Sequence, residues 1–242
     1  MLCKTPGLVL TSVRYGDNSL VVKIFTRQFG LQSYLVQGVR GGRTKGNKAA
    51  FFQPGTMLDL VLYNQPGKNL QRISEFTPLF LYKTVQQEVV KNCILLFVVE
   101  FLGKLLSEQG PMEDFFDFSV GLLQQMDQLP SRDIANFPLY FSVACSRFLG
   151  FDLAEIFEEE TTPHLKGINS RAGGSFAILF TLPEQQALSA LYQVREWTEL
   201  SNIALNGELR LQLIEKLATF YLNEMHGQGQ LKSLPVLKAI LQ

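Results

Sequence analysis

A change in hydrophobic pattern near residue 78 most constrains how this chain of 242 residues can fold. Before it, short segments rich in Val, Ile, Leu and aromatic residues are separated by turn sequences such as residues 16–18 and 64–67. After it, apolar residues recur at helical spacing. The sequence therefore predicts an α+β protein with a strand-rich first domain, residues 1–78, and a mostly α-helical second domain, residues 79–242.

Five strands are predicted in the first domain. They cover residues 7–15, 19–26, 31–38, 57–63 and 69–76. In the second segment Val22 and Ile24 share one face, while Val21, Lys23 and Phe25 share the other. Closing so short a sheet into a barrel would remove its exposed edges. We therefore expect a closed five-stranded β-barrel.

The second domain is expected to contain six helices. Their expected ranges are residues 83–110, 112–129, 134–150, 182–194, 206–225 and 231–241. Residues 151–183 have no clear period and are expected to form a small irregular or hairpin insertion. No apolar run reaches the roughly 18 residues of a membrane span, so we expect no membrane partner. The three separated cysteines and the lack of a signal-peptide pattern favour the cytoplasm.

The positive charge of this formally neutral chain is concentrated near its start. The first 72 residues hold ten lysines and arginines against two acids, whereas residues 73–242 hold 12 basic and 20 acidic residues. Four cations, at positions 40, 43, 45 and 48, lie in the glycine-rich stretch 36–54, which contains no acid. Such asymmetry indicates that the first domain binds a polyanion.

The glycine-rich stretch does not fit a nucleotide-binding loop. Residues 41–48 have the glycine spacing of such a loop, but Asn47 takes the position of the phosphate-binding lysine. Basic strands with interspersed aromatic residues are instead typical of an OB-fold, the small barrel that binds single-stranded nucleic acid. The candidate DNA-binding residues are Arg14, Tyr15, Lys23, Arg27, Arg40, Arg43, Lys45 and Lys48.

Catalytic and metal-binding motifs are not recognisable. The cysteines are isolated and the two histidines, His164 and His226, are far apart, so the paired ligand spacing of a zinc site is missing. We expect no enzyme, no catalytic residue, no metal and no cofactor. Two other classes stay open: an adaptor that binds acidic protein tails without binding DNA, and a metal-dependent nuclease.

Several short motifs, in their order and spacing, resemble the RecO family of bacterial DNA repair and recombination mediator proteins. They are Tyr15-Gly16-Asp17, Phe25-Thr26, Gly30, Gly38-Val39-Arg40, Gly41-Gly42-Arg43, Phe52-Gln53-Pro54, Leu149-Gly150-Phe151 and the closing residues 231–241. The resemblance implies an N-terminal OB-fold, a helical C-terminal domain and no enzymatic activity.

The resemblance also implies a function and partners. A RecO protein would bind single- and double-stranded DNA, anneal complementary strands and help to load recombinase onto single-stranded DNA coated by single-stranded DNA-binding protein. Its partners would be RecR and the acidic C-terminal tail of single-stranded DNA-binding protein, and its location cytoplasmic and nucleoid-associated. Candidate contacts for the tail are Arg132, Phe141 and Arg147. Some family members carry a four-cysteine zinc module near residues 168–176, where this chain has no cysteine, so a metal-free version is expected.

Overall fold

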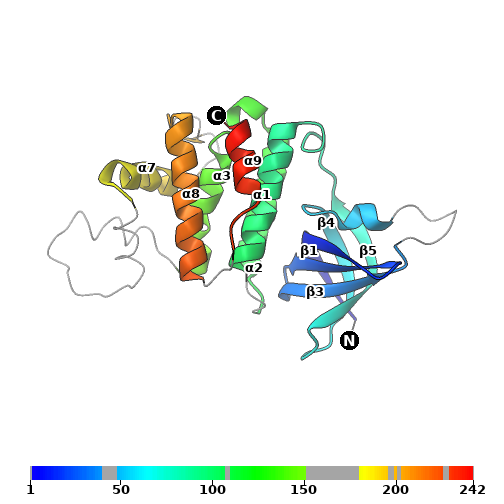
Figure 1. Ribbon diagram of the computed structural model, residues 1–242. Helices are drawn as coiled ribbons and strands as arrows, with labels where there is room; N and C mark the ends of the chain where they lie inside the picture. Colours follow the sequence, from blue (N-terminus) through cyan, green and yellow to red (C-terminus); the bar gives the residue numbers. More distant parts are fainter. Residues whose placement is uncertain are drawn as a thin grey trace, which may run out of the picture. The chain divides into compact units, whose positions relative to one another are not determined.

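The computed structural model describes residues 2–39, 48–106, 110–150, 180–195, 199–200, 203–225 and 229–241. The chain divides into two compact units, Met1–Gln128 and Leu129–Gln242. The first unit contains a β-barrel and two helices, and the described elements of the second unit are helices (Figure 1). The domain boundary expected after residue 78 lies close to the end of the last strand, and it stays a prediction.

The first unit contains the predicted five-stranded barrel. Its strands are β1 (Leu2–Tyr15), β2 (Ser19–Thr26), β3 (Gly30–Gln37), β4 (Met57–Tyr63) and β5 (Leu70–Phe80), closed in the order β1-β2-β3-β5-β4. All neighbouring pairs are antiparallel except β3 and β5, which are parallel. Strand β1 pairs with both β2 and β4, and a register shift between Val9 and Thr11 bends it from one partner to the other. This double pairing closes the barrel.

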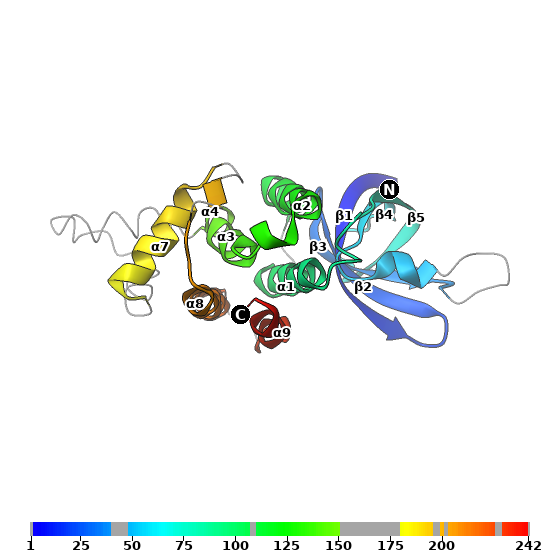
Figure 2. The ribbon, with the colours of Figure 1, turned by 90° about the horizontal axis from the view of Figure 1, so that it is seen from above.

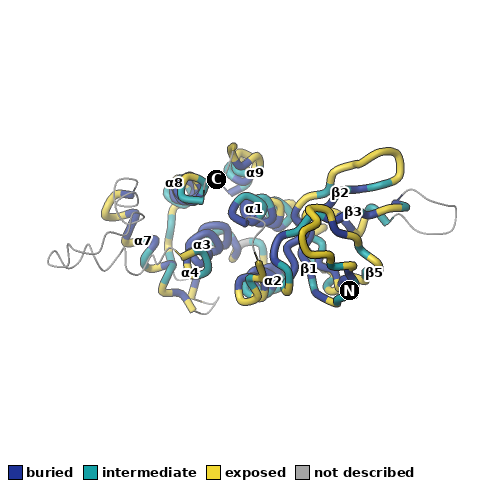
Figure 3. The backbone as a smooth tube through the Cα atoms, turned by 90° about the horizontal axis from the view of Figure 1, so that it is seen from below, coloured by how far each residue is buried: buried dark blue, intermediate teal, exposed yellow. Residues whose placement is uncertain are grey.

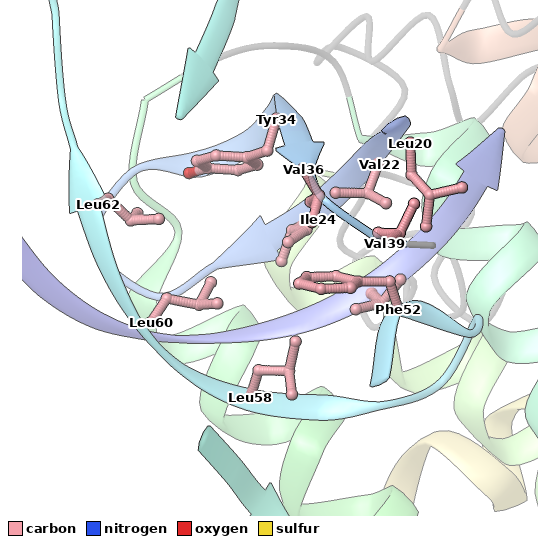
Figure 4. Packing of buried hydrophobic residues seen from close by; sticks show 11 residues of the cluster. Leu20, Val22, Ile24, Tyr34, Val36, Val39, Phe52, Leu58, Leu60 and Leu62 are labelled. Atoms are coloured by element: carbon pink, nitrogen blue, oxygen red, sulfur yellow. The ribbon is translucent and has the colours of Figure 1, made fainter. Parts of the chain in front are cut away.

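The alternation of the strands produces the barrel core. Leu58, Leu60 and Leu62 point inward from β4, and Val22 and Ile24 face them from β2, all of them buried (Figure 4). A further aromatic ring enters from the short 3-10 helix η1 (Lys48–Phe52), whose last residue packs edge-on against Phe76 with ring centroids 4.8 Å apart. The residues between these inward positions point outward, which leaves the outer surface of the barrel to bind helices or ligands.

Two helices cover one section of that outer surface. They are α1 (Val89–Leu105) and α2 (Glu113–Gln128). Phe25 points outward from β2 but is fully buried, because its ring contacts Phe115 and Phe116 of α2 at centroid distances of 5.9 and 5.4 Å. The outward-facing remainder of β2, β3 and β5 is therefore the part of the barrel wall that α2 leaves open.

Helix α1 begins six residues later than the period predicts, at Val89 rather than residue 83. The segment before it makes a contact that is distant in sequence. The backbone N–H groups of Lys83, Thr84 and Val85 all donate to the carboxylate of Asp127, at 2.8 to 3.0 Å. The carboxylate satisfies these three backbone donors, and the N–H groups of Gln87 and Glu88 both donate to the Thr84 carbonyl oxygen, so the segment before α1 forms a turn.

The second unit packs its helices around a very apolar segment. Its described helices are η2 (Ser131–Asp133), α3 (Phe137–Ala144), α4 (Ser146–Leu149), α7 (Leu182–Gln193), α8 (Gly207–Glu224) and α9 (Ser233–Ile240). Both α7 and α8 contact α3 (Figures 1 and 2). Every residue of α3 is buried, and the Tyr221 hydroxyl of α8 donates to the Ser142 carbonyl oxygen at 2.9 Å. The single helix expected over residues 134–150 is two helices that meet at Cys145.

Two expectations concern segments beyond these elements. Residues 151–179, which hold most of the expected insertion, lie outside the described residues. Among the helices that the structure describes, none has both the length and the apolar character needed to cross a membrane.

Candidate nucleic-acid interface

Outward-facing side chains form two adjacent rows across the open part of the barrel wall. The residues of each row are those that lie opposite one another on neighbouring strands. One row contains Val13, Val21, Leu35, Arg72 and Tyr63, and the next contains Thr11, Lys23, Ser33 and Leu70. Many of these residues are exposed or half-buried, in contrast to the buried interior of the barrel (Figure 3). The rows combine aromatic, aliphatic and basic side chains, which are the groups that contact single-stranded nucleic acid.

Three of the sequence-predicted residues lie on or beside these rows. Lys23 is exposed in the middle of β2. Arg14 and Tyr15 end β1 next to the turn into β2, and the Tyr15 side chain is 62% exposed. Among the described acids, none lies within salt-bridge distance of Arg14 or Lys23. Both cations are therefore available to an anionic ligand.

The glycine-rich stretch 36–54, called the basic stretch below, has one cation, Lys48, among the described residues. Lys48 is half-buried and begins η1, the element that also delivers Phe52 to the barrel core. Arg40, Arg43 and Lys45 lie outside the described residues. Val39 and Phe52 both belong to the buried core of the barrel, so the described ends of this stretch are fixed to the barrel.

Arg27 has a different environment from the other predicted cations. Its Nη1 lies 2.6 Å from the Glu113 carboxylate, and its Nε donates to both oxygens of Asp117 at 2.8 and 3.0 Å. The hydrogen bond to Asp117 is the main reason that the pKa of Arg27 is raised above its ordinary value. A DNA phosphate would have to displace two carboxylates to reach this guanidinium. Arg27 therefore serves the contact between the barrel and α2, and we leave it out of the interface.

A groove beside the loop between β4 and β5 contains residues that the sequence analysis did not select as site residues. Its volume is about 530 Å³, and it is lined by Leu35, Tyr63, Gln65, Lys68, Leu70, Gln71 and Arg72. Lys68 and Arg72 contribute to the basic character of the first 72 residues. Tyr63 was missed because its position opposite Arg72 follows only from the register. The alternation of Leu58, Leu60 and Leu62 was the signal that would have placed Tyr63 on the outer face.

The residues suggested for binding an acidic protein tail are poorly placed for it. Phe141 is fully buried in α3, with its ring stacked on Phe137, so it does not present a surface to a peptide. Arg147 is exposed, but its guanidinium donates to the Tyr192 carbonyl oxygen and lies 4.6 Å from the centre of the Tyr192 ring. The Arg132 side chain lies outside the described part of the structure. The assignment of these three residues to tail binding stays a prediction.

Metal binding requires a group of ligands, and thiol catalysis requires a thiolate. In the part of the chain that the structure describes, no three side chains of His, Cys, Asp or Glu gather in a group that could hold a metal ion. Burial raises the pKa of the Cys145 thiol well above its ordinary value, which disfavours the thiolate that a nucleophile needs.

Comparison with known proteins adds family information to this geometry. Residues 1–82 match the family model "Recombination protein O N terminal", and residues 86–156 match "Recombination protein O C terminal". A protein of Phocaeicola vulgatus named DNA repair protein RecO is 36% identical over 153 residues, which cover 62% of this chain and 61% of that protein. Proteins of the same name from Flavobacterium psychrophilum and Flavobacterium johnsoniae are 28% and 26% identical, with 99% of each chain covered. The two family models in succession and the full-length relatives show that this chain belongs to the RecO family.

Proposed function

We propose that this protein acts in DNA repair as a non-enzymatic mediator that binds DNA on the open outer wall of its barrel. The observation that carries the proposal is the pair of outward rows on β1–β5, where Lys23 and Arg72 stand among aromatic and aliphatic side chains without acidic partners in the described structure. The relatives named DNA repair protein RecO support the role in repair.

Charge neutralisation gives this surface a mechanism. Lysines and arginines that contact phosphates release condensed counterions, and they reduce the repulsion between two DNA strands. A barrel that holds one strand in this way would promote annealing with a complementary strand. The cations of the basic stretch, Arg40, Arg43, Lys45 and Lys48, would add contacts to whichever strand lies against the wall.

The acidic remainder of the chain suits protein contacts better than DNA contacts. Residues 73–242 hold eight more acids than bases, so their net field repels a polyanion. We assign to this part the binding of RecR and of the acidic tail of single-stranded DNA-binding protein, which would help recombinase to load onto coated single strands. DNA binding would place the protein with the nucleoid in the cytoplasm.

The alternative is an adaptor whose cations bind only acidic protein tails. A gel-shift series with labelled single- and double-stranded oligonucleotides, with and without Mg²⁺, separates the classes. The mediator shifts both oligonucleotides, leaves them intact with Mg²⁺, and releases them as salt rises. An adaptor shifts neither, and a nuclease cleaves them when Mg²⁺ is added. Absence of a shift at low salt would overturn the proposal.

A further inference from the structure

The groove beside the β4–β5 loop has the composition of a nucleotide-binding site. Tyr63 and Arg72 are directly opposite each other on antiparallel strands, and Leu35 neighbours Arg72 on the other side. Opposite residues on one face of such a pair have Cβ atoms about 5 Å apart, so the Tyr63 ring and the Arg72 side chain are in reach of each other. Lys68 contributes a second cation, and the groove lining includes no acid.

The loop that borders the groove is fixed by a buried side chain. Gln71 alternates with Leu70 and Arg72, so its side chain points into the barrel, where it is 4% exposed. Its Nε2 donates to the carbonyl oxygens of Gln65 and Lys68 at 2.8 and 2.9 Å, and its Oε1 accepts from the Gln65 N–H at 3.0 Å. Three hydrogen bonds from one side chain hold the loop in a single conformation. The groove is therefore organised before any ligand binds.

The exposed fractions indicate that the groove is open to a ligand. Tyr63 is 45% exposed and Leu70 is 39% exposed, so part of each side chain can contact a ligand. A phosphate alone would use Lys68 and Arg72 but not the apolar floor. A duplex would offer phosphates but keep its bases stacked inside. The ligand that uses the whole groove is an unpaired nucleotide, with its base on Tyr63 and its phosphates at Lys68 and Arg72.

We propose that this groove, with Tyr63, Lys68 and Arg72 around the floor formed by Leu35 and Leu70, binds one unstacked nucleotide and so adds affinity for single strands that a duplex does not gain. The inference rests on the proposed function, because it names a site within the same DNA-binding surface. Tyr63 and Arg72 contact the nucleotide, and Gln71 is a positioning residue that acts through the loop.

The test is the affinity of the full chain for a single-stranded oligonucleotide and for the matching duplex, compared between variants. Because stacking on one aromatic ring contributes a substantial part of the binding free energy per base, Tyr63→Leu should weaken single-strand binding about tenfold. Tyr63→Phe should restore it, since phenylalanine keeps the stacking face. Duplex binding should be unchanged in both variants.

A fluorescent base gives a second readout. Fluorescence of 2-aminopurine in the single strand should be quenched on binding to the unchanged chain and to Tyr63→Phe, and less quenched with Tyr63→Leu under saturation. Gln71→Leu, which keeps the buried volume but loses the loop hydrogen bonds, should reduce single-strand affinity in the same direction.

The outcomes separate this inference from the function on which it rests. Equal single-strand affinity of Tyr63→Leu and the unchanged chain would overturn the nucleotide groove and leave DNA binding by the barrel intact. An equal loss of single-strand and duplex affinity would also overturn it, because a base-stacking site cannot act on a closed duplex. Failure of the unchanged chain to bind either DNA would overturn the proposed function itself, and the groove with it.

Discussion

Arg27 and Asp117 join the barrel to α2 through an ion pair with a bifurcated hydrogen bond. The Arg27 Nε donates to Oδ1 at 2.8 Å and to Oδ2 at 3.0 Å. The neighbouring Glu113 carboxylate contacts the same guanidinium. On the same side of the barrel, Phe25 packs against Phe115 and Phe116. A cation in the most basic part of the chain is thus used for a contact between the barrel and α2, and Lys23 and Arg72 are the cations that we propose for DNA binding.

Arg27→Ala is expected to affect the stability of the first unit more than its DNA binding. Losing an exposed ion pair should shift the midpoint of urea unfolding slightly downward, because such pairs are screened by solvent. The DNA dissociation constant at fixed salt should stay the same. Lys23→Ala is the matched control and should show the reverse: an unchanged unfolding midpoint and weaker DNA binding. A loss of DNA affinity in Arg27→Ala as large as in Lys23→Ala would contradict our assignment of Arg27.

Asp127→Asn is expected to destabilise the first unit strongly at neutral pH. The buried carboxylate accepts from three consecutive backbone N–H groups and from the Thr84 hydroxyl, whereas an asparagine would turn an NH₂ group toward some of these donors. Hydrogen bonds to a charged acceptor contribute more than neutral ones, so we expect a loss of about 2–4 kcal/mol in the free energy of unfolding. Urea denaturation at pH 7 measures it.

The pH dependence of that loss provides the control. Burial raises the pKa of Asp127, but the hydrogen bonds from Lys83, Thr84 and Val85 outweigh it, so the pKa in the folded protein is lowered. The carboxylate therefore stabilises the fold above its unfolded pKa of about 4, and this contribution is lost as the pH falls through the folded value. The stability difference between Asp127→Asn and the unchanged chain should shrink below about pH 4. A difference that stays constant with pH would show that charge plays no part.

Gly55→Ala tests the contact between the barrel and α1. Gly55 has a φ of 89°, and an added Cβ would lie 2.5 Å from Cδ2 of Leu95. Backbone strain and overpacking together should lower the free energy of unfolding by about 2–5 kcal/mol. Gly16→Ala is the control, because Gly16 has a φ of 62° but open space around its Cβ, so only the strain of about 1–2 kcal/mol applies. Equal losses of unfolding free energy in both variants would mean that the Leu95 side chain moves aside without destabilising the fold, and would contradict a tight contact between the barrel and α1.

The barrel was predictable because its signal is local. Val22 and Ile24 alternate with Lys23, as expected for a strand, and glycines lie in the turns that separate the strands. The strand pattern and the turn residues therefore predict the same strand boundaries. The start of α1 at Val89 was not predictable from the apolar spacing, because Val85 fits the same helical period and yet lies in the turn before the helix. The end of α3 at Cys145 was not predictable for another reason. The sequence of α3 is uniformly apolar, so no change of hydrophobic pattern marks where the helix ends.

The residues of the candidate site also differ in whether local sequence or long-range packing decides their exposure. The alternation of β2 put Lys23 on the face opposite Val22 and Ile24, and in the structure that face points outward and Lys23 is exposed. Phe25 shares that face in the sequence pattern but is buried under α2, and Arg27 is paired with Asp117 of the same helix. Which outward residues stay open depends on where α2 packs. Tyr63 required the register between β4 and β5, which no segment carries by itself.

The salt dependence of single-strand affinity tests the central claim most directly. If the barrel wall binds the phosphate backbone through about five contacts, log Kd plotted against log salt has a slope of magnitude about 3.5 for the unchanged chain. The double variant Lys23→Gln/Arg72→Gln should reduce that magnitude by about 1.4, since each lost contact with single-stranded DNA contributes about 0.7. The matched variant Arg195→Gln/Lys232→Gln, which removes the same charge from the second unit, should leave the slope unchanged. Equal slopes for both double variants would contradict the assignment of DNA binding to the barrel wall.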